Sequence, residues 1–325
     1  MLDPKIETDM KKILIASLAA LAVFSAACSK SDVAESGKMQ VRVSASAEDL
    51  ASKVTSSTSG RFTWQKGDAI GVWTGAGITK FTLDPEWDGF GYGEFVGELP
   101  EGGAIDADSY AVYPYSEGAE ATATGYTWPS VPKMAIPTSN YMLYARGEVT
   151  EKDGKVADFH FKHSTAYFRV TVKNIRADIN GLYIESAGPC FAMGNKVEFS
   201  DGGVVLTPAL DENIVYALPE HSGVVESITL VIPVAAGTYE QAYGKGGLKF
   251  RIAGYSAPDW WSTKYDDFAG YFGEGTGFTV AAGDYYVFPD LRFANAKSAD
   301  DSGSGVNDGI EDAVVVVQDP DGFWK

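Results

Sequence analysis

The chain has 325 residues, 45% of them hydrophobic and 13% aromatic, which is enough to form the cores of two domains of ordinary size. Its 44 acidic side chains outnumber its 26 basic ones, and the formal net charge at pH 7 is −18. A surface of this sign repels a phosphate backbone, so the composition argues against nucleic-acid partners.

The N-terminal segment, residues 1–27, predicts a secretory signal. Met10, the expected true start, precedes two lysines and a twelve-residue apolar run that is too short to span a membrane. Small residues then lead to Cys28, an ending similar to the lipobox of bacterial lipoproteins, in which the cysteine becomes the lipidated first residue. Ser25 stands where that pattern prefers leucine, and an ordinary signal with a chance cysteine is the alternative. We expect an exported lipoprotein, lipidated at Cys28.

Strand patterns begin after a polar tether, residues 28–37. Residues 39–47 alternate strictly between apolar and polar side chains, which predicts a half-buried strand. The apolar positions on one face of this strand are Met39, Val41, Val43, Ala45 and Ala47, and the first four are the candidate core positions. Four further strands of the first half are predicted between Gly, Asp and Pro clusters, at 69–73, 80–83, 92–99 and 109–115.

The second half continues the β pattern. Between 159–163 and 166–172 the apolar phase shifts by one residue, which predicts a bulge or a bend. Later strands are predicted at 181–186, 204–207, 214–218, 227–234, 247–255 and 284–289. Because no window after the signal keeps a helical apolar period, we expect an all-β protein of two consecutive sandwiches, 38–155 and 156–293.

The C-terminal segment, 294–325, begins with an acidic Gly/Ser-rich linker over 294–312. A valine run follows at 313–318. Such a short strand is not stable alone and needs a partner strand.

Residues that could carry catalysis are sparse. His160 and His163 are three apart in a predicted strand, which places them on opposite faces, and His221 lies in a turn without an obvious partner. With Cys28 lipidated, Cys190 is a lone thiol that we expect to be buried. We therefore predict no enzyme, no metal site and no cofactor, and a glycosidase has no specific support.

Two adjacent tryptophans, Trp260 and Trp261, are candidates for ligand contact, since exposed aromatic rings beside acids can stack on a sugar. The alternative is that one ring lies in the core and the other covers it. A surface glycan-binding lipoprotein that does not polymerise is accordingly the second functional hypothesis.

The stretch "FTWQKGDAIGVW" resembles the N-terminal region of the fimbrillin family, the Mfa-like and FimA-like fimbrial lipoproteins. The matching residues are Trp64, Gly67, Asp68, Ile70, Gly71 and Val72. Two further stretches, 109–116 and 159–170, resemble the family at similar spacing, although the family's Pro-x-x-Gln turn lacks its glutamine here. The resemblance covers the first half of the chain.

The resemblance implies two tandem transthyretin-like β-sandwich domains and a role as a fimbrial subunit or adhesin at the outer membrane or cell surface. It also implies that an Arg-specific protease removes the first strand and that a strand from another subunit, of the same or a different protein, then fills the groove. A host protein or glycan is a further implied partner. Stalk, anchor and tip roles all stay open.

This sequence contains a counterpart for each part of that implied mechanism. Arg61 ends a flexible Ser/Thr/Gly run and is the candidate cleavage site, the alternative being an ordinary loop charge. The alternating strand 39–47 is the candidate displaced strand. The candidate donor strand is Val314, Val315, Val316 and Val317, and its alternative role is the last strand of its own domain.

Overall fold

The computed structural model describes residues 39–52, 61–130, 133–135, 141–150, 154–175, 177, 179–186, 188–239, 249–255, 267–271, 278–287, 291–292 and 315–316. Within these ranges the chain is all-β, as the sequence predicts, and its one helical turn is the 3-10 turn η2 (Pro85–Trp87). None of the described helical structure is long and apolar enough to cross a membrane.

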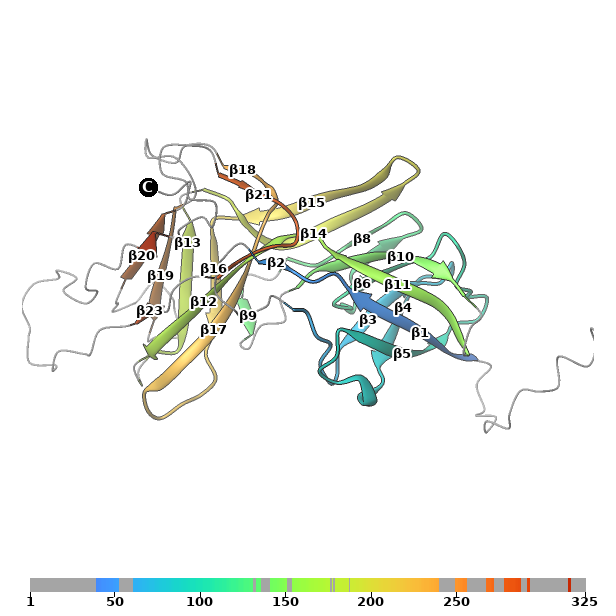
Figure 1. Ribbon diagram of the computed structural model, residues 1–325, viewed down its shortest axis with the longest axis horizontal. Helices are drawn as coiled ribbons and strands as arrows, with labels where there is room; N and C mark the ends of the chain where they lie inside the picture. The colour runs from blue at the N-terminus through green and yellow to red at the C-terminus, as the bar shows by residue number, and fades with distance from the viewer. Residues whose placement is uncertain are drawn as a thin grey trace, which may run out of the picture. The chain divides into compact units, whose positions relative to one another are not determined.

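Seven strands form a sheet that closes into a barrel, since its last strand pairs with its first (Figure 1). In spatial order they are β1 (Met39–Ala47), β11 (Lys155–His163), β10 (Leu143–Val149), β6 (Tyr110–Tyr113), β3 (Ala69–Trp73), β4 (Ile78–Leu83) and β5 (Tyr92–Leu99). The strands predicted at 39–47, 69–73 and 92–99 have these same bounds.

In the barrel interior, large side chains on one strand pack against glycines on the neighbouring strand. Gly97 on β5 pairs with Phe81 on β4, and a Cβ on Gly97 would lie 2.6 to 2.8 Å from three atoms of the Phe81 ring. Gly147 on β10 likewise pairs with Phe159 on β11, and a Cβ there would lie 2.8 Å from that ring. Glycine thus makes room for fully buried aromatic rings at both pairs.

Two larger sheets and one two-stranded sheet contain the remaining described strands. The first follows the order β2 (Ala51–Ser52), β22 (Asp284–Val287), β12 (Ala166–Ile175), β17 (Val225–Val234), β14 (Phe191–Ser200), β8 (Gly125–Thr127) and β7 (Glu120–Thr122), with β15 (Gly203–Asp211) on β14 and β23 (Leu291–Arg292) on β12. The second follows the order β24 (Val315–Val316), β20 (Asp267–Tyr271), β19 (Lys249–Tyr255), β13 (Gly181–Ser186), β16 (Asn213–Ala217) and β9 (Lys133–Ala135). The small sheet pairs β18 (Gly237–Tyr239) with β21 (Phe278–Val280).

A second hydrophobic core is formed by side chains of β12, β14 and β17 from one large sheet and β13 and β16 from the other. On β17, Leu230, Ile232 and Val234 are buried in this core. The phase change that the sequence predicts falls at Ser164 and Thr165. There the chain bends and passes from the barrel strand β11 to β12 of the other sheet.

The boundary expected between 155 and 156 falls at the start of β11, which completes the barrel, and β7, β8 and β9, which precede it in sequence, join the two large sheets. The transthyretin-like description of two tandem sandwiches and their boundary therefore stay predictions.

Replacing Gly97 with alanine should test the large-over-small packing of the barrel. We expect Gly97→Ala to lower the free energy of unfolding by about 1–3 kcal/mol, because Phe81 is fully buried and cannot move aside. Urea denaturation measures the change. The matched control is Gly223→Ala, where a Cβ has nothing within 4 Å and should change stability by no more than about 0.5 kcal/mol. Equal effects of the two substitutions would contradict this packing.

Candidate functional site

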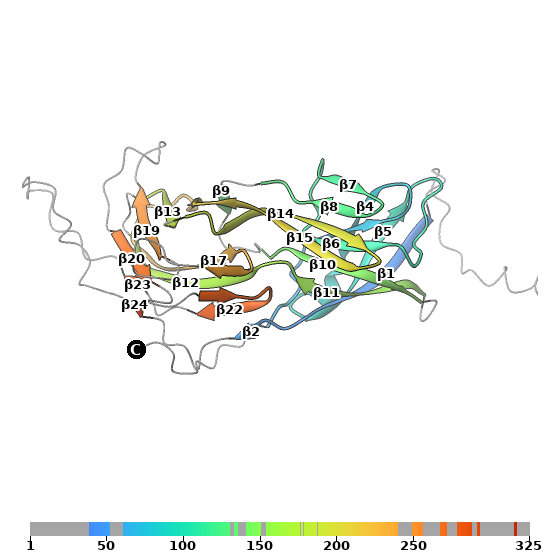
Figure 2. The same ribbon diagram turned by 90° about the horizontal axis from the view of Figure 1, so that it is seen from above.

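The first strand, β1, is paired along both of its edges. It runs antiparallel to β5 over Met39–Ser46 and parallel to β11 over Arg42–Ala47 (Figure 1; Figure 2). No other described strand pairs with both β5 and β11. Taking β1 away would open the barrel at this point and leave the facing N–H and C=O groups of β5 and β11 without partners.

The inward side chains of β1 belong to the barrel core. Val43 and Ala45 are 0% and 1% exposed and Val41 is 7% exposed, as predicted, but Ser44, which the alternation places outward, is also buried at 1% exposed. Met39 differs from the prediction, since it lies at the end of the strand and is 61% exposed. Burying one valine stabilises a fold by about 1.5–3 kcal/mol, so these residues fix β1 in its place.

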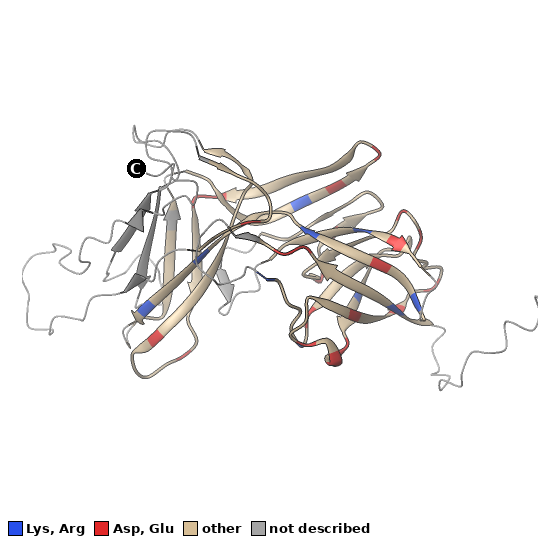
Figure 3. Cartoon of the chain, in the orientation of Figure 1, with Lys and Arg blue, Asp and Glu red and all other residues tan. Residues whose placement is uncertain are grey.

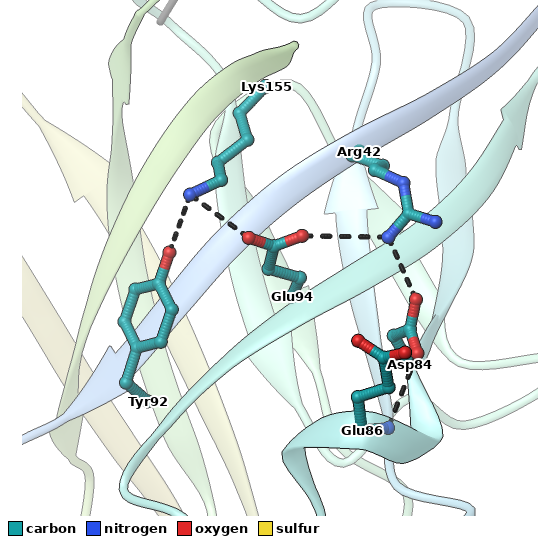
Figure 4. A network of polar contacts seen from close by, with 6 residues as sticks. All are labelled: Arg42, Asp84, Glu86, Tyr92, Glu94 and Lys155. Atoms are coloured by element: carbon teal, nitrogen blue, oxygen red, sulfur yellow. Dashed lines mark hydrogen bonds and ion pairs between the residues drawn. The ribbon is translucent and has the colours of Figure 1, made fainter. Parts of the chain in front are cut away.

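The outward face of β1 has a charged network, which we call the Arg42 network (Figure 4). The Arg42 guanidinium is 2.8 Å from the Asp84 carboxylate and 3.5 Å from that of Glu94 on β5. Glu94 also contacts the Lys155 ammonium of β11 at 3.1 Å, and Lys155 donates to the Tyr92 hydroxyl at 2.8 Å. The network thus connects β1 to both of its neighbouring strands. Further acidic and basic residues lie on the barrel strands (Figure 3).

Hydrogen bonds in the Arg42 network alter the ionisation of its members. The hydrogen bond from Arg42 lowers the pKa of Asp84, and the bond from the Glu86 amide to Asp84 acts in the same direction. Conversely, the hydrogen bond to Asp84 raises the pKa of Arg42. Lys155 has a raised pKa because of its contacts with Tyr92 and Glu94. These shifts keep Asp84, Arg42 and Lys155 charged at neutral pH.

The chain that follows β1 is fixed by a buried histidine. The Glu48 amide donates to the carbonyl of Phe161 at 2.9 Å, and His163 donates from Nε2 to the Glu48 carbonyl at 3.1 Å. The other ring nitrogen, Nδ1, lies 3.3 Å from the Tyr167 hydroxyl. Three residues after Glu48, β2 begins and pairs with β22 of the next sheet (Figure 2). The segment after β1 is therefore anchored in two sheets.

Arg61, the predicted cleavage site, is exposed, whereas the residue after it is not. Phe62 is 4% exposed, and its ring lies 4.7 Å from that of Trp64 and 5.4 Å from that of Tyr141. The Arg61–Phe62 peptide bond thus lies between a residue with an exposed side chain and a residue whose side chain is buried in the core. The Ser/Thr/Gly run before it, 53–60, lies outside the described residues.

The C-terminal valines are described in part. Val315 and Val316 form β24, which pairs in parallel with Gly270 and Tyr271 of β20 in the same chain. Val314 and Val317 lie outside the described residues, as do Cys28, Trp260 and Trp261. The roles predicted for these residues stay predictions.

The remaining reactive groups have structural surroundings. His160 is exposed and lies on the opposite face of β11 from buried His163, as their spacing predicts, and its Nδ1 is 2.7 Å from the Ser46 hydroxyl. His221 lies 2.9 Å from the Ile179 carbonyl through Nε2. Burial raises the pKa of the Cys190 thiol to about 12, so it is a poor nucleophile. The described residues contain no group of three acidic, His or Cys side chains suited to a metal ion.

The sequence pattern does not predict the Arg42 network. Asp84, Glu94 and Lys155 come from three other segments, and no local motif connects them with Arg42. The strand register that brings them together depends on the closed barrel.

No protein-family model matches this chain, and no curated protein matches it by sequence. Among solved structures, a candidate cell adhesion protein from Bacteroides ovatus is similar at 12% identity and a TM-score of 0.41, over 79% of this chain and 93% of that one. A fimbrial protein from Bacteroides ovatus is 12% identical with a TM-score of 0.32, over 78% of this chain and 50% of that one. The fimbrial anchor protein Mfa2 from Porphyromonas gingivalis is 9% identical with a TM-score of 0.30, over 78% and 90%. These three structures are of fimbrial and cell adhesion proteins.

The histidine that anchors the end of β1 predicts a pH dependence of stability. Burial lowers the pKa of His163 to about 4, from an ordinary value of about 6.5. Between these values the unfolded chain binds a proton that the folded chain does not, so stability falls as pH drops from about 6.5 to 4. The shift corresponds to at most about 3 kcal/mol.

Urea midpoints measured from pH 7 to 4.5 check this expectation. We expect the pH-dependent loss of stability to be smaller in His163→Gln and unchanged in His160→Gln, where the histidine is exposed. A His163→Gln protein with the same pH slope as the original chain would contradict the assignment.

Proposed function

We propose that this chain is a subunit or adhesin of a surface fimbria and that it assembles by exchanging its first strand for a strand of another subunit. The observation that carries the proposal is that β1 closes the barrel between β5 and β11 and contributes Val41, Val43 and Ala45 to its core. A barrel that lost this strand would expose unpaired backbone N–H and C=O groups and a row of apolar sites. A strand from another chain can pair with the backbone groups and fill the apolar sites, which is the physical basis of β-augmentation.

The sequence supplies a route to export and release. The signal over 1–27 and the lipobox at Cys28 support export as a lipoprotein, held at the outer membrane until the first strand is removed. The connection from β1 passes through the polar run 53–60 to exposed Arg61, which suits an Arg-specific protease. Cleavage there would leave β1 and β2 attached only by non-covalent contacts.

The geometry at Arg61 places a condition on that cleavage. A protease must hold residues on both sides of the bond that it cuts, and Phe62 is packed against Trp64 and Tyr141. Local opening that draws Phe62 out of the core must therefore precede the cut. When this opening is fast compared with cleavage, the rate of cutting follows the population of the open form.

Exchange between identical or different subunits is head-to-tail, because the slot and the donated strand are different parts of the molecule. Contacts of that kind give open filaments when the rotation does not close a ring. The proposed donor is the valine run Val314–Val317, whose described part pairs with β20 and would have to leave it. A host protein or glycan is the proposed target of the finished fimbria.

Controlled proteolysis tests the cleavage step. An Arg-specific protease should cut the folded chain after Arg61 and give a product that begins at Phe62, as N-terminal sequencing would show. Phe62→Ala should speed the cut at least several-fold, because the opening step no longer breaks core contacts. Arg61→Gln should block it. A folded chain that is cut elsewhere while the Arg61–Phe62 bond stays intact would count against the maturation route.

Size-exclusion chromatography after proteolysis tests the assembly step. Once β1 is removed, we expect the chain either to form larger species or to lose several kcal/mol of stability, because at least two buried valines leave the core. The Arg61→Gln chain, treated in the same way, is the control and should stay monomeric. A cleaved chain that loses β1 and yet remains a stable monomer would refute strand exchange.

A further inference from the structure

We propose that the slot occupied by β1 selects its strand by charge as well as by shape, and that it favours a strand with a basic side chain at the position of Arg42. This inference rests on the proposed exchange of the first strand. It identifies the preferred partner as a different protein that presents such a strand, in place of a second copy of this chain donating its valine run.

The inward half of the slot selects by size. Along β11 the neighbours of β1 are Ala157, Phe159 and Phe161, which pair with Val43, Ala45 and Ala47 respectively. The valine of β1 thus faces an alanine of β11, and the two alanines of β1 face the two phenylalanine rings. A strand entering this slot needs the same order, medium first and then small, because all three neighbours are fully buried.

On the β5 side of the slot, the inward positions are closely packed. Gly97 and Gly93 pair with Val41 and Ala45, and their missing side chains make space for residues of β4. A Cβ on Gly93 would lie 2.6 Å from Leu83, and one on Gly97 would lie 2.6 Å from Phe81. The space behind each glycine is therefore already filled, and larger inward side chains on an incoming strand would clash.

The outward half of the slot selects by charge. Asp84 and Glu94 converge on Arg42 at 2.8 and 3.5 Å, and their side chains are 20% and 19% exposed. With β1 absent, Glu94 keeps its contact with Lys155, whereas Asp84 loses the guanidinium beside it. When a strand fills the slot as β1 does, the two acids are about four-fifths buried, so an acid on that strand would be repelled more strongly than beside a fully exposed pair, because water screens it less. A base at this position restores the contact.

The chain's own valine run is poorly matched to this charge pattern. Residues 313–318 contain no basic side chain. Glu311 and Asp312 precede the run, and Asp319 and Asp321 follow it. Placing the run in the slot would bring acids towards Asp84 and Glu94 without a compensating base. Its consecutive valines also present branched side chains where the slot takes alanine.

A strand-binding experiment tests the selection. The full chain is given one site-specific protease sequence within 53–60, so that the cut does not depend on Arg61, and is then cleaved. Fluorescent nine-residue peptides compete with the resident strand, and anisotropy gives their affinities. The probes are residues 39–47 and 311–319 of this chain, together with Arg42→Gln and Met39→Glu versions of the first.

The two peptide variants carry the same net charge, which separates a local contact from a general effect of charge. Arg42→Gln should weaken binding about two- to fivefold, in line with partly exposed ion pairs. Met39→Glu should weaken it less than twofold, because Met39 is 61% exposed and pairs across the strand with Leu99. The 311–319 peptide should bind at least tenfold more weakly than the 39–47 peptide. Asp84→Asn in the cut chain, which keeps an acceptor for the Glu86 amide, should reduce the preference for arginine.

Two outcomes overturn the charge selection while leaving strand exchange standing. One is equal binding of the 39–47 peptide and its Arg42→Gln version, and the other is binding of 311–319 as tight as that of 39–47. If no peptide enters the cut chain, strand exchange itself fails. A double-mutant cycle of Arg42→Gln and Asp84→Asn in the uncut chain then decides the charge selection, because additive effects on unfolding would refute it and a measurable coupling would uphold it.

Discussion

The barrel of this protein depends on the pairing of β1 with β5 on one side and with β11 on the other. Without β1, the other six strands form an open sheet whose two edges face each other across a gap. Val41 and Val43 make the same strand part of the hydrophobic core. One segment thus closes the backbone hydrogen bonding and completes the packing, so the fold is most sensitive to change at this strand.

Two kinds of contact hold β1, and they differ in how they could be replaced. Apolar packing requires only side chains of suitable size, which many strands have. The Arg42 network requires a cation within reach of Asp84 and Glu94, which few strands have by chance. The first contact makes replacement of β1 physically possible, and the second makes it selective.

Much of the fold could be predicted from the sequence, because strand periodicity is a local signal. The strand 39–47 was predicted with its observed bounds, since apolar and polar residues alternate along it without a break in the sequence. What depends on register could not be predicted. Asp84 is 42 residues from Arg42 in sequence, and only the closed barrel brings them to 2.8 Å.

The candidate site was predicted in part, for a related reason. The exposure of Arg61 follows from the polar run before it, but the burial of Phe62 depends on Trp64 and Tyr141, which approach only in the folded barrel. Similarly, Met39 continues the apolar alternation and yet is exposed, because it lies at the end of the strand where the core stops.

The most direct test of strand exchange is the N-terminal sequence of this protein purified from assembled surface filaments. Loss of the first strand predicts a chain that begins after β1, at Phe62 if Arg61 is the cleavage site. Filaments whose subunits still begin at lipidated Cys28, with β1 in place, would contradict the account.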